Sequence, residues 1–265
     1  MPLAGALVEL DWSAPWLVPW RELGEAVTAR VLRGAALPAA LNDVASSLAA
    51  QAISFVEHSA LSPGLAYEQF VSDCGQCPTR ENLHDFFNGL CWLRFPKIKR
   101  RFNTLQVQAM QAATASGKAV RGPVRDALTL FDENGALLQA PPALWAALQE
   151  RDWRALLVDG RDSWREARLT LFGHALLEKL VAPRKAITAH IYLFDLCLSA
   201  APQWAELDAG VAADLSAEKL SQKPFLPLPV LGVPGWCVAN AAPAFYADPA
   251  VFRPGTRTGA QAHSL

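Results

Sequence analysis

Three polar residues, His84, Asp85 and Asn88, stand among large apolar residues in the segment LHDFFNGLCWL. On a helix, positions 84 and 88 share a face because residues four apart are neighbours. Polar side chains on an apolar face need hydrogen-bond partners or a water-filled cleft. One interpretation is a catalytic or ligand-binding histidine held by a neighbouring carboxylate. The other is that Asp85 and Asn88 brace the helix while His84 bonds a carbonyl group.

A second candidate is the pair His174 and Glu178 in FGHALLEKL. Their four-residue spacing places an imidazole and a carboxylate on one helix face, within reach of one metal ion. A metal site needs a third ligand, and His190 is the nearest candidate by residue type. These three residues therefore predict a site for a divalent metal such as zinc, although the cofactor's identity stays open. A hydrogen-bonded His–Glu pair without metal is the alternative.

Asp126 is a further candidate because it precedes a segment, 127–131, that we expect to be a strand. From there it could point into a site as an acid, a base or a ligand. The alternative is that it serves turn geometry, as carboxylates near turns commonly do. The same alternative applies to Asp132 and Glu133, which flank the predicted turn at Asn134-Gly135.

Basic residues are dense only between Arg94 and Arg101. Lys97 and Arg101 share a helix face, where a phosphate-bearing ligand or an RNA backbone could dock. The alternative is a solvated helix face. A CxxC motif at Cys74 and Cys77 lacks the second close cysteine pair of a zinc site and the βαβ pattern of a thiol oxidoreductase, so we predict no role for it.

The spacing of apolar residues predicts helices at 21–32, 38–52, 80–95, 96–115 and 142–157. The third would be capped by Thr79. Pro96 separates the third from the fourth.

Strands are predicted on either side of a hairpin turn at Asn134-Gly135, over 127–131 and around Leu137. A strand leading into a helix near Gly173 is expected within 164–181. The segment 186–198 is either a helix or a buried strand. From Lys223 onward, frequent prolines predict extended segments and turns that wrap the body.

The fold class expected is therefore mainly α with a small β component (α+β), its helices packed around a short hairpin or small sheet. With 265 residues, 52% of them hydrophobic, the chain can bury a large core. We predict one globular domain over 1–254, an internal loop at 116–123 and a flexible tail at 255–265.

The balance of 24 basic against 25 acidic residues offers no charge surplus for duplex binding, so we expect a small-molecule ligand and no nucleic-acid partner. Five scattered cysteines do not suggest a secreted disulfide framework. The N-terminus has no signal-peptide pattern, and the most apolar stretch, 187–201, is too short for a membrane span. We expect a cytoplasmic protein without a membrane partner, its oligomeric state left open.

Four ordered segments resemble the bacterial domain-of-unknown-function 3025 family over about 67–254: PTRENLHDFFNGLCWLRFPKIKRRFNTLQ, RDALTLFDENGALL, LFGHALLEKLVAPRKAITAH and PLPVLGVPGWCVAN…AFYADPAVFRP. The resemblance implies an identity without a mechanism. Its polar motif positions match His84, Asp85, Asn88, Lys97, Asn103, Asp126, Asp132, His174, Glu178 and His190. The resemblance thus implies that these residues form one constellation. The chain departs from the family at Cys77, where an apolar residue is usual.

The leading hypothesis is a metal-assisted hydrolase or related small-molecule enzyme. His174, Glu178 and either His84 or His190 would hold the ion, and Asp85 or Asp126 would orient a ligand or act as base. A non-catalytic binding or scaffold protein with a structural polar core is the alternative. Phosphate or RNA binding through Lys97 and Arg101 is the third.

Overall fold

The computed structural model describes residues 2–48, 53–115, 122–194 and 203–255. Its helices are α1 (Leu3–Val8), α2 (Arg21–Leu32), α3 (Leu37–Ala45), α4 (Tyr67–Cys74), α5 (Leu83–Arg94), α6 (Pro96–Ala115), α7 (Pro123–Asn134), α8 (Pro142–Glu150), α9 (His174–Lys179), α10 (Trp204–Asp214) and α11 (Ala217–Ser221). Its strands are β1 (Ser54–Glu57), β2 (Gln76–Thr79), β3 (Gly135–Gln139), β4 (Arg168–Leu171), β5 (Thr188–Tyr192) and β6 (Phe225–Pro229). The predicted mainly helical α+β fold is confirmed.

The larger sheet has the strand order β4-β3-β5-β6. Strands β3 and β5 run parallel, whereas β3–β4 and β5–β6 are antiparallel. Ala136 lies opposite Leu171 on one side and Ile191 on the other. Because β3 has a neighbour on each side and α7 packs against it, its residues 135–138 are buried.

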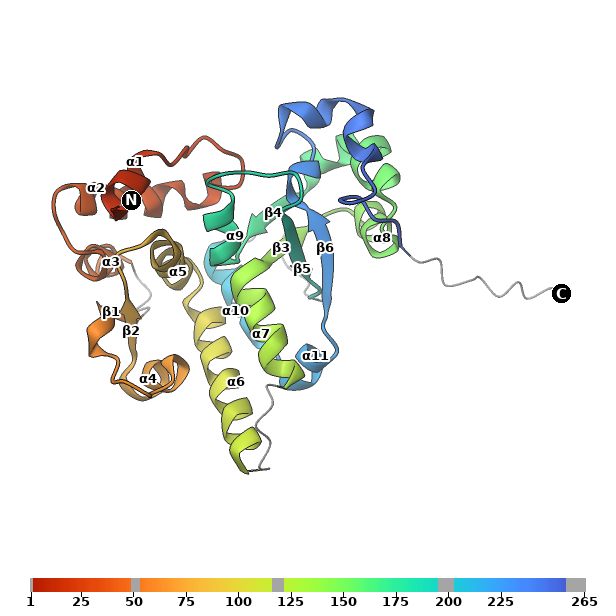
Figure 1. Ribbon diagram of the computed structural model, residues 1–265. Coiled ribbons are helices and arrows are strands. Elements are labelled where there is room, and N and C mark those ends of the chain that lie inside the picture. The colour runs from red at the N-terminus through yellow and green to blue at the C-terminus, as the bar shows by residue number, and fades with distance from the viewer. Residues whose placement is uncertain (1, 49–52, 116–121, 195–202, 256–265) are drawn as a thin grey trace.

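Helix α7 lies over this sheet and is anchored by Phe131, which is fully buried. The Phe131 ring stacks on Tyr192 of β5, with centroids 4.7 Å apart, and contacts Phe102 of α6. Figure 1 shows α6 and α7 side by side, between the N-terminal helices and the four-stranded sheet. The last turn of α7 is therefore fixed against the start of β3.

The N-terminal part carries a second, two-stranded parallel sheet of β1 and β2. Asn42 of α3 binds it by exchanging two hydrogen bonds, each 2.7 Å, with the backbone of Phe55. Strand β2 leads into α5 through a short turn, so this small sheet determines where α5 begins.

The predicted extended C-terminal wrap is confirmed, because β6 is followed by short 3-10 turns. Asn240 secures it by donating to the carbonyls of Leu231 and Val233, and the Trp153 indole donates to the Arg253 carbonyl. One hydrophobic cluster of buried residues extends along the whole described chain. The single domain over 1–254 stays a prediction, and positions 116–121 and 256–265 of the predicted loop and tail lie outside the described residues.

Several predicted elements are confirmed. Helix α2 covers 21–32 as predicted, and α6 covers 96–115. The predicted strand leading into a helix near Gly173 corresponds to β4 and α9. The ambiguous segment 186–198 forms strand β5 in its first part, while positions 195–198 lie outside the described residues.

The strand predicted at 127–131 and the hairpin at Asn134-Gly135 are wrong. Ala127, Leu128 and Phe131 form the buried face of helix α7, since their spacing of one, three and four residues fits a helix. Gly135 has a φ of −75° and begins β3 directly after the helix ends. The hairpin signal therefore marks a helix-to-strand junction.

Three predicted helix boundaries are also wrong. Helix α5 begins at Leu83 behind Asn82, whose side chain accepts from the Asp85 amide, while Thr79 belongs to β2. Helix α3 ends at Ala45, and 49–52 lie outside the described residues. Helix α8 ends at Glu150, because the next residue adopts a left-handed conformation with φ 53°.

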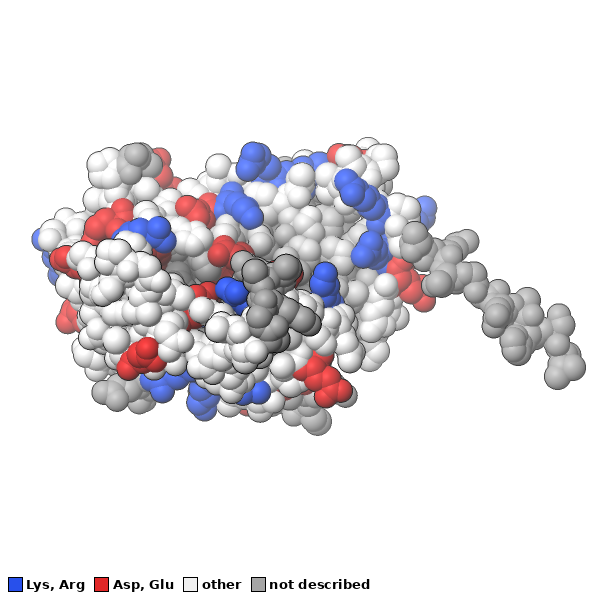
Figure 2. Space-filling view, turned by 60° about the horizontal axis from the view of Figure 1, so that its bottom comes forward, with Lys and Arg blue, Asp and Glu red and all other residues white. Residues whose placement is uncertain are grey.

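The surface carries both charge signs. Figure 2 shows lysine and arginine side chains interspersed with acidic ones and with wide uncharged areas on one face. Among the described helices, none combines the length and the hydrophobicity needed to cross a bilayer.

Candidate metal centre

Three helix ends meet where α5, α7 and α9 come together. His84 lies in the first turn of α5, Glu133 in the last turn of α7, and His174 is the first residue of α9. In Figure 1, α9 lies between α5 and the four-stranded sheet, and contacts join it to both α5 and α7. The site thus draws on segments that are far apart in the sequence.

Backbone contacts bring these helix ends together. The carbonyl of Gly135 accepts from the amides of Phe172 and Gly173, at 2.9 and 2.8 Å, so the start of α9 is tied to the end of α7. The buried thiol of Cys91 on α5 donates to the Phe172 carbonyl at 3.1 Å. Because Phe172 and Gly173 directly precede His174, both links position the same imidazole.

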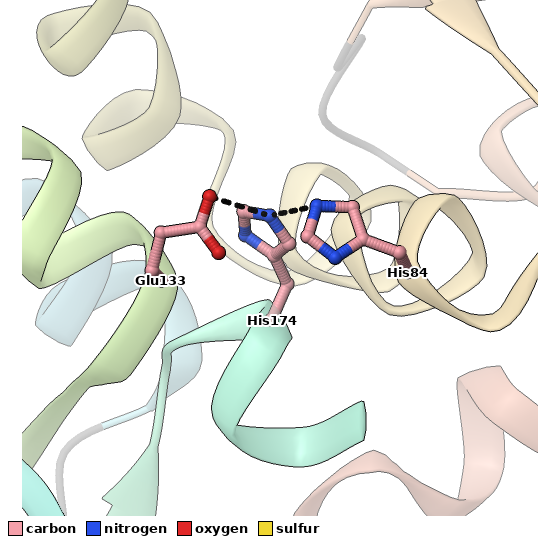
Figure 3. A group of neighbouring side chains, drawn as sticks. All are labelled: His84, Glu133 and His174. Carbon is pink, nitrogen blue, oxygen red and sulfur yellow. Dashed lines mark hydrogen bonds and ion pairs between the residues drawn. The ribbon is translucent and has the colours of Figure 1, made fainter. Parts of the chain in front are cut away.

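The side chains of His84, Glu133 and His174 point toward one another (Figure 3). The two Nε2 atoms of the histidines lie 3.0 Å apart, and Glu133 Oε1 lies 3.6 Å from the Nε2 of His174. All three ligand atoms fall within 4.8 Å of one another. Two imidazole nitrogens and a carboxylate oxygen at such distances are a typical donor set for zinc and similar divalent ions.

Each imidazole also has a carboxylate on its other nitrogen. The Nδ1 of His84 donates to Glu178 Oε2 at 3.0 Å. The Nδ1 of His174 lies 3.7 Å from Asp132 Oδ1, just beyond hydrogen-bond distance. Metal-binding histidines commonly have such a carboxylate behind them, which fixes the ring and leaves the other nitrogen free for the ion.

A buried lysine completes the charged network. The Lys99 ammonium, 5% exposed, donates to Asp132 and, at 2.8 Å, to the side-chain oxygen of Asn88. Burial alone would raise the pKa of Asp132, but Lys99 and His174 outweigh burial and hold that pKa well below its usual range. Asp132 is therefore ionised beside the His174 ring.

A cavity of about 210 Å³ opens beside these groups. Histidine, carboxylate, amide and aromatic side chains share its wall, and its lining residues include His84, Asn88, Trp92, Lys99, Phe102, Asn103, Gln106, Asp132, Glu133 and His174. A small molecule or water inside it would therefore contact the His–Glu cluster.

Tyr67 and Cys77 form a second polar contact at the cavity wall. The Tyr67 hydroxyl lies 3.1 Å from Cys77 Sγ and accepts from the Asn88 amide at 3.4 Å. Burial, followed by the nearby thiol, raises the pKa of Tyr67 well above its usual range. Burial likewise raises the pKa of Cys77 to about 11. Both groups are therefore neutral near pH 7, and Cys77 is a weak nucleophile.

Three of the predicted site residues, His84, Asp85 and Asn88, line this cavity, and each makes a different kind of contact. His84 is a direct member of the cluster. Asp85 lines the cavity, but its carboxylate accepts from the backbone and guanidinium of Arg80, so it fixes the turn before α5. Asn88 bridges Lys99 and Tyr67 and thereby braces the cavity wall.

The predicted ligand set needs correction. His174 belongs to the cluster, but Glu178 contacts the far nitrogen of the His84 ring, so it orients a histidine from behind. His190 lies on β5, where burial and then the Lys179 ammonium lower its pKa, and it is not part of the cluster. The third residue of the cluster is Glu133, because the end of α7, not β5, faces His174.

Asp126 and the two basic residues lie elsewhere. Asp126 is an exposed residue of the first turn of α7, so the predicted position at the start of a strand is wrong. Lys97 and Arg101 lie on the side of α6 that faces α10, where the Lys97 amide donates to Asp208 and the Arg101 guanidinium to the Leu215 carbonyl. The lysine that reaches the cavity is Lys99, because it occupies a different face of the same helix.

Sequence reasoning missed three members of the site: Lys99, Asp132 as a neighbour of a histidine, and Glu133 as a member of the His–Glu cluster. The two acidic residues were assigned to a hairpin turn because Asn134-Gly135 follows them. A helical interpretation of 123–134 would have placed both acidic residues in the last turn of a helix. The signal available in the sequence was the helical spacing of Ala127, Leu128 and Phe131.

Comparisons with curated proteins and with solved structures gave no match. The family model described as a protein of unknown function (DUF3025) matches residues 53–256, most of the chain's 265 residues. All the residues of the His–Glu cluster lie within this range, as do the two carboxylates behind the histidines. The chain therefore belongs to the DUF3025 family of proteins of unknown function.

Proposed function

We propose that the protein binds one divalent metal ion, with zinc the best fit, through His84, Glu133 and His174, and hydrolyses a small molecule there. The proposal rests on the three ligand atoms that approach within 4.8 Å from three separate helices. Ligands of these types, two nitrogens and one carboxylate oxygen, occur in catalytic zinc sites that keep a fourth position for water.

One observation carries the proposal: the Nε2 atoms of the two histidines face each other at 3.0 Å, with a carboxylate beyond each ring and Glu133 beside them. His84 uses its Nδ1 proton for Glu178, so its Nε2 has no proton when the ring is neutral. The carboxylate of Asp132 favours the same tautomer in His174. With both rings in this tautomer, the two Nε2 atoms present their lone pairs to one another at 3.0 Å, an arrangement that a bound cation stabilises.

A hydrogen bond between the two rings is the competing explanation. A neutral His174 with its proton on Nε2 would donate to the Nε2 of His84 and would need no metal. The third group, Glu133, supports a metal ion, because a hydrogen bond between the rings involves only their two nitrogens, whereas Glu133 supplies a third ligand atom 3.6 Å from the Nε2 of His174. A metal ion accepts three protein ligands readily.

The chemistry then follows from the cavity. An ion with three protein ligands lowers the pKa of a bound water and so supplies a nucleophile near neutral pH. Glu178 and Asp132 keep the two imidazoles oriented. Lys99 holds Asp132 in place and adds positive charge at the cavity wall, where charge developing on a substrate oxygen would be stabilised.

The decisive experiment measures zinc content. Purified protein is stripped with chelator, dialysed against zinc and analysed by mass spectrometry for bound metal. We expect one zinc per chain in the wild type and in His190→Ala, and a loss of tight binding in His84→Ala, His174→Ala and Glu133→Gln. Wild-type protein that retains no stoichiometric zinc, cobalt or manganese after dialysis would overturn the proposal.

Asp85 and Asn88 favour the alternative of a structural polar core, because their side chains form hydrogen bonds to other groups of the protein. That alternative does not explain why His84, His174 and Glu133 face one another. The cytoplasmic location stays a prediction, and it is supported by the free thiols of Cys74, Cys77, Cys91 and Cys237.

A further inference from the structure

Arg80 is the exposed cation in the lining of the cavity beside the His–Glu cluster. Two side chains with a permanent positive charge, Lys99 and Arg80, belong to this lining. The Lys99 side chain is 5% exposed and already binds Asp132 and Asn88, whereas the Arg80 side chain is 56% exposed. Of the two, Arg80 is therefore the cation that a ligand arriving from solvent can reach.

A buried carboxylate holds the Arg80 guanidinium by one edge. The Nε and Nη2 atoms of Arg80 donate to the two oxygens of Asp85, at 3.2 and 3.3 Å. The Asp85 side chain is 6% exposed, and the Asp85 amide donates to Asn82 at the start of α5. Because His84 lies in the same turn of α5, the guanidinium is anchored to the helix that supplies a histidine of the cluster.

This pairing leaves part of the guanidinium without a partner. The group is planar with five N–H donors, and the pair with Asp85 uses two of them. A second edge, formed by Nη1 and the outer hydrogen of Nη2, has no hydrogen-bond partner among the described residues. The two parallel N–H groups of such an edge match the two oxygens of a carboxylate. Asp85 therefore orients Arg80 and leaves a fork for a second anion.

A purely structural role is the alternative for this ion pair. The Asp85 carboxylate also accepts from the backbone amide of Arg80, at 2.7 Å. That bond ties the turn before α5 to the helix without any help from the arginine side chain. The turn alone therefore does not explain why an exposed guanidinium is held in place at the cavity.

The acidic residues of the lining favour a singly charged ligand group. Asp85 and Asp132 face Arg80 and Lys99, but the carboxylates of Glu68 and Glu133 share the same lining. They repel a doubly charged phosphate more strongly than a carboxylate, since the repulsion grows with the charge.

We propose that Arg80 binds a carboxylate group of the substrate, with Asp85 orienting its guanidinium. The substrates are then small molecules that carry one free carboxylate. That this carboxylate belongs to a substrate rests on the function proposed above.

The test titrates benzoate and benzamide, probes of nearly the same shape that differ in charge, by ligand-observed NMR. Both metal-free and zinc-loaded protein are used, and in both we expect benzoate to bind the wild type more tightly. Arg80→Gln should weaken benzoate binding roughly tenfold, the effect of losing a charge-assisted hydrogen bond, and leave benzamide binding unchanged. Arg80→Lys keeps the charge without the fork, so it should weaken benzoate binding roughly threefold.

Arg154 provides a matched control. It is an exposed arginine whose Nε also donates to an aspartate at 3.2 Å, Asp159, but it does not line the cavity. Arg154→Gln should therefore leave the affinities for both probes unchanged. Thermal melts check that the three variants are folded.

The outcomes separate this inference from the metal proposal. Zinc content is measured on every sample, and Arg80→Gln should bind zinc normally because Arg80 is not part of the His–Glu cluster. Absent or non-saturable binding of benzoate, equal benzoate affinity of wild type and Arg80→Gln, or an equal loss of both probes overturns the carboxylate site while the metal proposal stands. Tighter binding of phenylphosphonate than of benzoate overturns it as well. A wild type that takes up no zinc overturns the metal proposal, whereas the effect of Arg80→Gln is still measured on the metal-free protein.

Discussion

Gly173 lies in direct backbone contact with Glu133: a Cβ atom on this glycine would be 2.5 Å from the Glu133 carbonyl oxygen. The contact is possible only without a side chain, and it sets the first residue of α9 against the last turn of α7. We expect Gly173→Ser to lower the free energy of unfolding by roughly 1–3 kcal/mol, as overpacking does. Zinc affinity should fall as well, because His174 moves away from Glu133. Urea denaturation and zinc titration measure the two effects.

A matched control exists in the same part of the chain. Gly122 also precedes a helix as its N-cap residue and also has a negative φ, but nothing lies within 4 Å of a Cβ placed on it. Serine is favoured at N-caps. Gly122→Ser should therefore keep or raise stability and leave zinc affinity unchanged. Equal behaviour of the two variants would show that the close contact at Gly173 does not position the site.

Glu178 gives the second prediction. Because it orients His84 from behind without joining the His–Glu cluster, Glu178→Gln should keep one zinc per chain and weaken zinc affinity about 10–100-fold. A true ligand would lose tight binding altogether. Competition with a coloured chelator measures the affinity. Glu150→Gln, an exposed change at the end of α8, serves as control, and an unchanged affinity for Glu178→Gln would remove the orienting role.

The sequence predicted two of the three helices of this site, α5 and α9, but not the contacts between them. Residue types and four-residue spacing singled out His84, His174 and Glu178 as candidates, and the structure brings these three side chains together. Spacing along one helix could not show that Glu178 turns to the far side of the His84 ring. That relationship depends on how α9 packs against α5, which is a tertiary contact without a local signal.

The error at α7 had the largest consequence for the site. Asn134-Gly135 is a strong hairpin signal, and the apolar run before it was short enough to be taken for a strand. The tertiary environment decided otherwise, because Phe131 is buried between α6 and the sheet on a helical face. Once 127–131 was assigned to a strand, Glu133 was placed in a turn and could not be recognised as a neighbour of the two histidines.

The cysteines give the third prediction, on reactivity. Cys74 is exposed, whereas Cys77 is buried and burial raises its pKa to about 11. Burial raises the pKa of the Cys91 thiol further still. Since the thiolate is the reactive form, iodoacetamide at pH 8 should modify Cys74 in the native protein and spare both buried cysteines until urea is added. Peptide mass spectrometry locates the label; rapid native labelling of Cys77 would contradict its buried position.

Lys99 gives the fourth prediction. Lys99→Met keeps the length of the buried stem and removes the ammonium that faces Asp132. Breaking a buried ion pair costs about 3–5 kcal/mol, and we expect roughly 2 kcal/mol here because the Asp132 side chain remains 29% exposed. The double variant Lys99→Met with Asp132→Asn should recover part of that loss. Denaturation of the single and double variants measures the coupling; simple additivity would mean that the two charges do not interact.

The last prediction separates a metal centre from a structural polar core through stability with and without zinc. A ligand that binds only the folded state stabilises it by about 2.7 kcal/mol at a hundredfold excess over its dissociation constant. We therefore expect zinc to raise the melting temperature of the wild type and to leave that of His174→Ala unchanged. In chelator, His174→Ala should melt at or above the wild-type temperature, because residues of a functional site are often held in place at a cost to stability. A structural core predicts the reverse in chelator, a loss of several kcal/mol as a buried network is broken, and no response of the wild type to zinc.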